Sequence, residues 1–341
     1  MKKSEKNLHW SEEKEVIKTN KPVKFLFKLF QIFPSPVVLF LIYPIAFFYY
    51  IFSKRARTEC KIYQKNLKTF AKEKLSKRVS VYRQILSFTL CVLEKIEGWL
   101  GKFVYKDLIL HDDDLKNLQA LISSGKGAVI ISSHLGNIEL MRSLYNFGEN
   151  GLQKSVKISV IMEMKATEQF TKTLQEINPD FSLNVVTPGE ISPETIIDFQ
   201  ERIENGEMII FTGDRTSAAS KNRVIRNDFL GKPADFPYGV FLLAALLDAP
   251  VFYMFGLREK ISIFPRYNIY VEKSKISFDC KRAEREERIK ELCFEFVKKL
   301  EKFCVAYLHF DFVVMFFSCL LFCIQPSCIW VFNSVEYLSG L

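Results

Sequence analysis

The most informative segment of the chain for its architecture is Ala128-Val129-Ile130-Ile131-Ser132-Ser133-His134-Leu135-Gly136-Asn137. It begins as a continuous apolar run and ends in polar and turn-forming residues, which is typical of a buried parallel strand that leads into a loop. Runs of the same kind recur along the chain and alternate with patterns of helical periodicity. The predicted strands are 128–132, 158–162, 183–186, 208–212, 251–255 and 268–271, and the predicted helices between them are 138–147, 167–177, 193–205 and 238–247. This alternation predicts an α/β fold with a mixed, mostly parallel sheet flanked by helices.

Further helices are expected on either side of this region. Apolar residues recur at helical spacing between Tyr63 and Leu100, which indicates one or two amphipathic helices. Asp112-Asp113-Asp114 is interpreted as a capping cluster at the start of a short helix, because nothing nearby completes a set of metal ligands. Residues 282–304 predict a charged amphipathic helix that closes the domain.

The N-terminal part of the chain has the composition of a membrane anchor. Residues 1–22 are polar and highly charged, unlike the start of a cleavable signal. The apolar stretch that follows is densest over residues 37–52, slightly short of the roughly 20 residues that cross a bilayer. A basic collar comes next, Ser53-Lys54-Arg55-Ala56-Arg57, of the kind that contacts an anionic cytoplasmic leaflet. We therefore expect an anchoring helical segment within residues 23–56.

Three prolines bear on the form of this anchor. Pro34, Pro36 and Pro44 predict a kinked or re-entrant segment rather than a straight rod. The alternative is a buried core helix, which three prolines in so apolar a run disfavour.

The composition limits the partners. The chain has 341 residues, a net charge of +9 and 48% hydrophobic residues, so anionic partners are expected: phospholipid headgroups, phosphorylated lipids, an acidic carrier protein or nucleic acid. Nucleic acid is disfavoured because the lysines are spread along the chain without a basic stripe interleaved with aromatic residues. The 8 cysteines form no CxxC pair and no ligand spacing, so we predict reduced thiols in a cytosolic setting and no metal site.

His134 is the first candidate for catalysis, because imidazole titrates near neutral pH and a carboxylate can fix its tautomer. Glu139 follows five positions later. The turn-forming pair Gly136-Asn137 would let His134 precede a helix that carries Glu139 in its first turn. The two residues are interpreted as a general base and its orienting carboxylate. A solvated histidine at a strand end beside a surface glutamate is the alternative.

Two further polar clusters follow later strands. Asp214 and Arg215 come directly after the predicted strand 208–212 and could bind polar groups of a substrate or brace the loop, or they could form an exposed turn with a local ion pair. Arg223 lies with Lys221 and Arg226 in a polar loop, which is either a patch for phosphate or a carrier protein, or a solvated basic face.

The third cluster is Asp228-Phe229-Leu230-Gly231-Lys232-Pro233, followed by Phe236-Pro237-Tyr238-Gly239. It is interpreted as an apolar wall that could line an acyl-chain channel or hold a phosphate. A purely structural loop between a strand and a helix is equally compatible with the pattern.

These three clusters, in this order, resemble the lysophospholipid acyltransferase superfamily. The pattern is His134-x-x-x-x-Glu139 after a strand, Gly213-Asp214-Arg215 after a later strand, and then the Phe229–Pro233 motif. The chain is most similar to the bacterial branch that contains the late acyltransferases of lipid A biosynthesis (lauroyl or myristoyl transferases). The resemblance covers roughly residues 8–304, and Glu139 in place of the aspartate found in much of the superfamily favours this branch.

The resemblance implies transfer of a fatty acyl chain to a hydroxyl at the bacterial inner membrane, with the catalytic domain facing the cytoplasm. The donor would be acyl carrier protein or acyl-coenzyme A, the acceptor a lipid A-like glycolipid or a lysolipid, and no cofactor would be needed. His134 would be the base and Glu139 its orienter, while Asp214 and Arg215 would position substrate or stabilise developing charge. The other predicted substrate-binding residues are Asn137, Arg223, Gly231, Lys232 and Pro233.

Alternatives stay open within and outside this class. The acceptor could be a lysophospholipid or an ornithine lipid, and the chain could be a catalytically silent lipid-binding protein of the same fold.

The C-terminal segment has a different composition from the rest. No Lys or Arg occurs after Cys304, and residues 312–324 are apolar. Two interpretations are open, a second membrane-inserting segment or a tail produced by a shifted reading frame. The predicted organisation is a polar segment 1–22, a membrane anchor 23–56, an acyltransferase domain 57–304 and an apolar tail 305–341.

Overall fold

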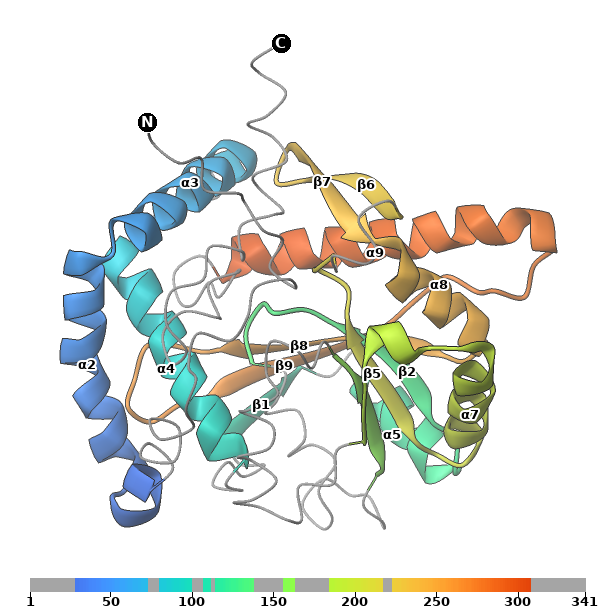
Figure 1. Cartoon of the computed structure of the whole chain (residues 1–341), viewed down its shortest axis with the longest axis horizontal. Helices are drawn as coiled ribbons and strands as arrows, with labels where there is room; N and C mark the ends of the chain where they lie inside the picture. Colours follow the sequence, from blue (N-terminus) through green and yellow to red (C-terminus); the bar gives the residue numbers. More distant parts are fainter. Residues whose placement is uncertain are drawn as a thin grey trace, which may run out of the picture.

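The computed structural model describes residues 28–72, 80–99, 107–111, 114–137, 156–162, 184–216 and 223–307. Its strands are β1 (Leu108–His111), β2 (Ala128–Ser132), β3 (Ile158–Ile161), β4 (Asn184–Val186), β5 (Met208–Thr212), β6 (Val224–Phe229), β7 (Lys232–Pro237), β8 (Val251–Arg258) and β9 (Tyr267–Lys273). Seven of them form one sheet in the order β1-β9-β8-β2-β5-β3-β4, and β6 pairs with β7 as a separate hairpin (Figure 1). Within the sheet only the β8–β9 pair is antiparallel. The prediction of an α/β fold with a mixed, mostly parallel sheet is confirmed.

The helices lie around this sheet. They are α2 (Ser35–Phe52), α3 (Lys54–Ala71), α4 (Val81–Trp99), α5 (Leu115–Ser123), α7 (Pro193–Glu204), α8 (Tyr238–Leu247), α9 (Arg285–Ala306) and two short 3₁₀ turns, η5 (Pro188–Glu190) and η7 (Arg282–Glu284). The predicted helices 138–147 and 167–177 lie outside the described residues, as do residues 1–22 and the tail beyond Tyr307. Asp114 immediately precedes α5, but its carboxylate accepts from the Lys273 amide at 2.7 Å and from Asn117, and makes no cap with the first amides of the helix.

Alternate residues of the central strands face two different layers. On one face, Val129 and Ile131 of β2 pack with residues of α7, α8 and α9. On the other face, Ala128 and Ile130 pack with Leu118 of α5. All five residues of β2 are buried, which explains why its sequence is continuously apolar rather than alternating.

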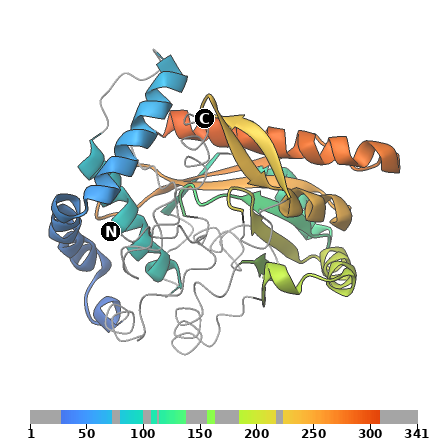
Figure 2. The same cartoon turned by 45° about the horizontal axis from the view of Figure 1, so that its top comes forward.

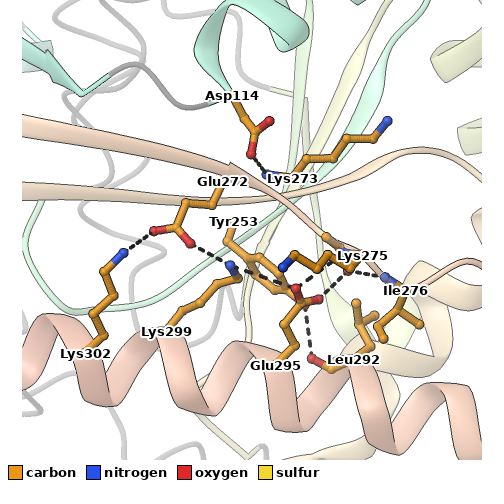
Figure 3. Close-up of polar contacts among 11 residues, drawn as sticks. Asp114, Tyr253, Glu272, Lys273, Lys275, Ile276, Leu292, Glu295, Lys299 and Lys302 are labelled. Carbon is orange, nitrogen blue, oxygen red and sulfur yellow. Dashed lines mark hydrogen bonds and ion pairs between the residues drawn. The ribbon is translucent and has the colours of Figure 1, made fainter.

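Helix α9 runs across one face of the sheet (Figure 2) and is tied to β9 by ion pairs. Glu272 accepts from Lys299 Nζ at 2.6 Å and from Lys302 Nζ at 2.8 Å. One turn earlier, Glu295 accepts from the Tyr253 hydroxyl and from Ser274, so that polar contacts follow the helix over about two turns (Figure 3). These contacts fix α9 in position against the two strands.

Helix α2 packs against α4 along one narrow stripe. Val38, Leu39, Ile42 and Ala46 are at most 7% exposed and contact a cluster that includes Leu86 and Leu90 of α4. Tyr43, Tyr49 and Tyr50 are half-buried against neighbouring clusters, and much of the remaining helix surface is exposed and apolar. Among the described residues α2 is the one helix long and apolar enough to cross a membrane, by length and composition only. Pro36 lies in its first turn and Pro44 in its interior, and the helix is nevertheless continuous from Ser35 to Phe52.

Candidate active site

The site lies at the carboxyl ends of two neighbouring parallel strands. Strands β2 and β5 pair in register up to Ser132 and Thr212, and the Gly213 amide continues the ladder by donating to the Ser132 carbonyl at 2.8 Å. His134 and Asp214 each follow two residues after these partners. The sheet therefore places their side chains at the same edge, where ligands bind in open α/β sheets.

Asp214 holds His134 with both carboxylate oxygens. Its Oδ2 accepts from the backbone amide of His134 at 2.8 Å, and its Oδ1 lies 2.9 Å from the ring atom Nδ1. An ionised carboxylate can only accept, so the shared hydrogen belongs to Nδ1, and the lone pair of the neutral ring is on Nε2. The His134 side chain is 28% exposed and that of Asp214 11%. The arrangement is that of a general base with a fixed tautomer.

The surroundings of Asp214 keep it ionised. Burial raises the pKa of this carboxyl, but the charge and the hydrogen bonds of His134 and the charge of Arg215 outweigh burial, so that the pKa lies below its ordinary value. The carboxylate can therefore stabilise an imidazolium when His134 takes up a proton.

A close approach of two backbone segments fixes the loop after His134. Gly136 has φ +82°, and a Cβ there would lie 2.0 Å from the carbonyl oxygen of Gly256 on β8. The next residue, Asn137, donates its amide to that same carbonyl at 2.8 Å. Ser132 adds a third contact to β8, from its hydroxyl to the Met254 carbonyl at 2.7 Å. Only glycine fits at position 136, and the loop contacts β8 through Ser132, Gly136 and Asn137.

The loop that carries Asp214 rests on α9. A Cβ at Gly213 would lie 3.1 Å from the ring of Phe296 and 3.1 Å from Ile131, so the backbone passes close over both side chains. Phe296 is fully buried, and α9 is fixed by the ion pairs shown in Figure 3. The helix therefore supports the strand end from which Asp214 reaches His134.

Two buried side chains beside the site were not predicted from the sequence: Cys304 of α9, which interacts with the charge of Asp214, and Tyr63 of α3, which interacts with Cys304. Burial raises the pKa of the Cys304 thiol well above its ordinary value, and the charge of Asp214 adds to the increase. Burial is also the main cause of the raised pKa of Tyr63, and the interaction with Cys304 is the second cause. More than 200 residues separate Tyr63 from Cys304 in the chain, so no local pattern could have placed them together.

The predicted site residues fall into two groups. His134, Asn137, Asp214 and Arg215 lie on the loops after β2 and β5, whereas the predicted orienter Glu139 lies outside the described residues. Asn137 is fully buried, and among the described residues neither its amide oxygen nor its amide nitrogen has a hydrogen-bond partner. Within the part of the chain that the structure describes, Asp214 is a carboxylate that contacts the His134 ring.

The remaining predicted residues belong to the β6–β7 hairpin. Arg223 precedes β6, and its carbonyl accepts from the Tyr238 amide at 3.2 Å. Gly231, Lys232 and Pro233 form the tip and the first residues of β7, not a loop between a strand and a helix.

The tip of this hairpin is anchored to α9 and α3. Leu230 and Gly231 both have positive φ, and the Leu230 amide donates to the buried carboxylate of Glu301 at 2.8 Å. A Cβ at Gly231 would lie 3.7 Å from the Phe70 ring of α3. The tip is thus part of the packing between α3 and α9.

The described residues contain no group of three His, Cys, Asp or Glu side chains arranged to hold a metal ion. Burial is also the largest cause of the raised pKa of Cys60 and Cys293, each about 12. Together with Cys304 these thiols are protonated at neutral pH and poor nucleophiles.

Comparison of the sequence with protein-family models and with curated proteins gives no match. The family resemblance of the three sequence clusters therefore stays a prediction.

Proposed function

We propose that the chain is a membrane-associated acyltransferase, which moves a fatty acyl chain from the thioester of acyl carrier protein or acyl-coenzyme A to a hydroxyl of a lipid A-like glycolipid or a lysolipid. The observation that carries the proposal is the double hydrogen bond between Asp214 and His134 at the paired ends of β2 and β5. It provides a positioned base in the tautomer that deprotonation of a hydroxyl requires.

In the proposed reaction, Nε2 of His134 takes the proton of the acceptor hydroxyl while the hydroxyl oxygen attacks the thioester carbonyl carbon. The tetrahedral species collapses when the carbon–sulfur bond breaks, and the departing thiolate recovers the proton from the imidazolium. Asp214 stabilises the imidazolium between these two proton transfers. Arg215, next to Asp214, is proposed to stabilise the developing negative charge on the carbonyl oxygen.

The cysteine chemistry supports direct transfer. The buried thiols Cys60, Cys293 and Cys304 have raised pKa values, so none of them is a good acyl acceptor at neutral pH. The base therefore acts on the acceptor hydroxyl itself, without an acyl-cysteine intermediate at these positions.

The buried amide of Asn137 supports a substrate contact. A buried polar side chain without a partner costs free energy, so its retention in a native structure requires an explanation such as strain, a bound water or ion, or a role in function. Asn137 follows His134 by three residues on the same loop, and we assign its amide to a polar group of the substrate.

Membrane association is proposed from the N-terminal helices. Helix α2 exposes a long apolar surface, and α3 follows it with six Lys or Arg residues and one Glu. This order fits an anionic cytoplasmic leaflet, in this proposal that of the bacterial inner membrane. A lipid acceptor would reach His134 from that surface.

The proposal is tested with the full chain in anionic vesicles, with labelled acyl carrier protein or acyl-coenzyme A and lipid extract of the host. The product is identified by mass spectrometry, so that glycolipid, lysophospholipid and ornithine-lipid acceptors are separate outcomes.

We expect His134→Ala to lose at least about a hundredfold in rate while remaining folded. The control is His111→Gln, at the end of β1, where the ring bonds Asn268 at 2.7 Å outside the site. Undiminished turnover in His134→Ala would show that the chain does not use this base.

A further inference from the structure

We propose that the chain binds the membrane edge-on, with α2 lying in one leaflet of an anionic bilayer, and that Phe264 of the loop between β8 and β9 inserts beside it. This inference rests on the membrane association proposed above and specifies its geometry. The surface formed by the exposed side of α2 and by Phe264 is called the α2–Phe264 face.

Exposed apolar side chains are concentrated on this face. Of the thirteen large apolar side chains that are exposed in the described part of the chain, ten lie in or just before α2. They are Ile32, Phe33, Val37, Phe40, Leu41, Ile45, Phe47, Phe48, Ile51 and Phe52, between 44% and 80% exposed. So large a contiguous apolar surface is unusual for a protein surrounded by water and marks an interaction surface.

The opposite side of α2 is fixed to the domain, which determines how the helix can enter a bilayer. Its buried stripe, including Leu39 and Ile42, packs on Leu86 and Leu90 of α4. Tyr82 at the start of α4 also donates its hydroxyl to the Tyr43 carbonyl at 3.3 Å. Helix α2 therefore lies along the flank of the domain and does not project from it (Figure 1).

Helix α4 in turn is held by the sheet. Glu94, fully buried, bonds Arg258 of β8 at 2.6 Å and 3.2 Å and accepts from the hydroxyl of Tyr267. If α2 crossed a bilayer with its stripe still on α4, the charged α4 and the adjoining strand ends would have to enter the hydrocarbon. An in-plane helix, immersed to about 5–10 Å, avoids this cost.

Phe264 extends the apolar surface from a distant part of the sequence. Its neighbours Ile261 and Ile263 pack into the same cluster as Val38 of α2, while Phe264 itself is 65% exposed. The β8–β9 connection reaches the side of the molecule that carries α2 in both views (Figures 1 and 2). Two segments more than 200 residues apart thus present aromatic side chains on one flank.

The charge next to this face identifies an anionic bilayer as its partner. Helix α3 continues directly from α2 and carries Lys54, Arg55, Lys61, Lys65 and Lys68 on exposed positions. Arg57 caps the end of α2 by donating to the carbonyls of Tyr50 and Ile51. An apolar helix that leads into a basic one fits the boundary between acyl chains and anionic headgroups.

The first test compares two serine substitutions of exposed apolar residues. Phe264→Ser is predicted to weaken binding of the full chain to vesicles of phosphatidylcholine with phosphatidylglycerol by about tenfold. Ile197→Ser, on α7 and 57% exposed, is the matched control and should leave binding unchanged. Equal binding of the two variants would remove Phe264 from the membrane contact.

The second test measures depth. Tryptophan replaces Phe40, Phe48 or Phe264 in separate variants, and quenching by lipids brominated near the headgroup or near the chain end is compared with that of the unsubstituted chain. An in-plane helix gives similar shallow depths at all three positions. A spanning α2, roughly 27 Å long, would instead place Phe40 or its neighbours near the bilayer centre and leave position 264 unquenched, which would overturn the proposal. Neither donor nor acceptor is present, so these results are independent of acyl transfer activity.

Discussion

Asp214 uses its two oxygens for two different donors, and this makes it sensitive to the smallest substitution. In Asp214→Asn one oxygen is replaced by an NH₂ group, which must then face either the His134 amide or the ring N–H. The ring would rotate or change its tautomer, and we predict a decrease in kcat of about 10²- to 10⁴-fold. The measurement is the rate of acyl transfer, together with circular dichroism as a check of folding.

Two matched variants complete this experiment. Asp235→Asn removes a carboxylate that pairs with Arg226 at 2.9 Å on the β6–β7 hairpin and should retain activity. Glu139→Gln tests the orienter predicted from the sequence. A large loss in Glu139→Gln with little loss in Asp214→Asn would assign the orienting role to Glu139 instead.

The unpartnered amide of Asn137 predicts a conflict between stability and activity. Asn137→Leu replaces two buried polar atoms by apolar ones of similar size, so we expect the free energy of unfolding to rise by about 1 kcal/mol. Acyl transfer should fall, mainly through KM if the amide binds the substrate. Urea unfolding and steady-state kinetics measure the two effects, and a variant that is both less stable and fully active would contradict this role.

At the level of single residues, the sequence identified His134 and Asp214 but not their contact. Spacing along the chain suggested Glu139 as the partner of His134; Glu139 lies outside the described residues, so this pairing stays a prediction. The Asp214 contact depends on β2 and β5 being adjacent, in the register that pairs Ser132 with Thr212. Both residues follow an apolar run by two positions, so knowledge of the strand order would have been enough to predict the pair.

Among the elements, the loop after β2 has little tolerance for added volume. Gly136→Ala would put a methyl group into the Gly256 carbonyl and force a non-glycine residue to φ +82°. We predict a loss of at least about 2 kcal/mol in the free energy of unfolding and a displaced His134 with reduced activity. Gly189→Ala is the control, because no atom lies within 4 Å of its Cβ position, and it should change stability by less than about 0.5 kcal/mol.

The contact between α9 and β9 should depend on pH through Glu272. Burial raises the pKa of this carboxyl, but its bonds to Lys299 and Lys302 outweigh burial and lower it. The folded state therefore gains stability from the ionised form above the ordinary pKa of about 4.3, and loses it as the pH falls through the lower folded value. We predict that Glu272→Gln costs about 2 kcal/mol at pH 7 and that the difference from the unsubstituted chain shrinks in acid.

Urea unfolding at several pH values tests this prediction. Glu287→Gln on the same helix is the control, since Glu287 is 70% exposed and lies 3.6 Å from Lys290. It should change stability by no more than about 0.5 kcal/mol at any pH. If the loss in the free energy of unfolding caused by Glu272→Gln grew as the pH fell, the prediction would be wrong.

The sequence predicted the buried elements better than the edge elements. Strands β2 and β5 and helix α8 have their predicted bounds, because the strands are buried on both faces and α8 is largely apolar, which makes each a continuous apolar run. Strands β6 and β7 were missed: each contains charged residues, and β7 contains two prolines, which is tolerated only where a strand pairs on one side. The Leu230-Gly231 turn between them lacks the asparagine or aspartate that usually signals such a hairpin.

At the scale of the whole molecule, one buried ion pair joins the N-terminal helices to the sheet that carries the site. Arg258 of β8 is 1% exposed and Glu94 of α4 is fully buried. Both carboxylate oxygens of Glu94 accept hydrogen bonds from the Arg258 guanidinium. Because α2 packs on α4, this pair also sets the position of the α2–Phe264 face relative to His134. Neither Glu94 nor Arg258 was singled out from the sequence, because a single charged residue in an amphipathic pattern does not indicate whether its side chain is buried.

The coupling between the two parts is testable through this pair. Arg258→Gln leaves the Glu94 carboxylate buried without its counter-charge, and we predict a loss of about 3–5 kcal/mol in the free energy of unfolding. Hydrogen exchange should accelerate most in α4 and α2 and least in β2 and β5, because the helices lose their attachment while the central strands keep their ladder.

The double variant Glu94→Leu/Arg258→Met should recover most of the loss, since apolar side chains of similar volume can replace a buried pair. The control for loss of an arginine alone is Arg266→Gln, because Arg266 is exposed and its guanidinium lies 3.9 Å from Glu259. If exchange rose equally in all elements, the helices and the sheet would unfold as one unit, and α2 and α4 could not be loosened without disrupting the site.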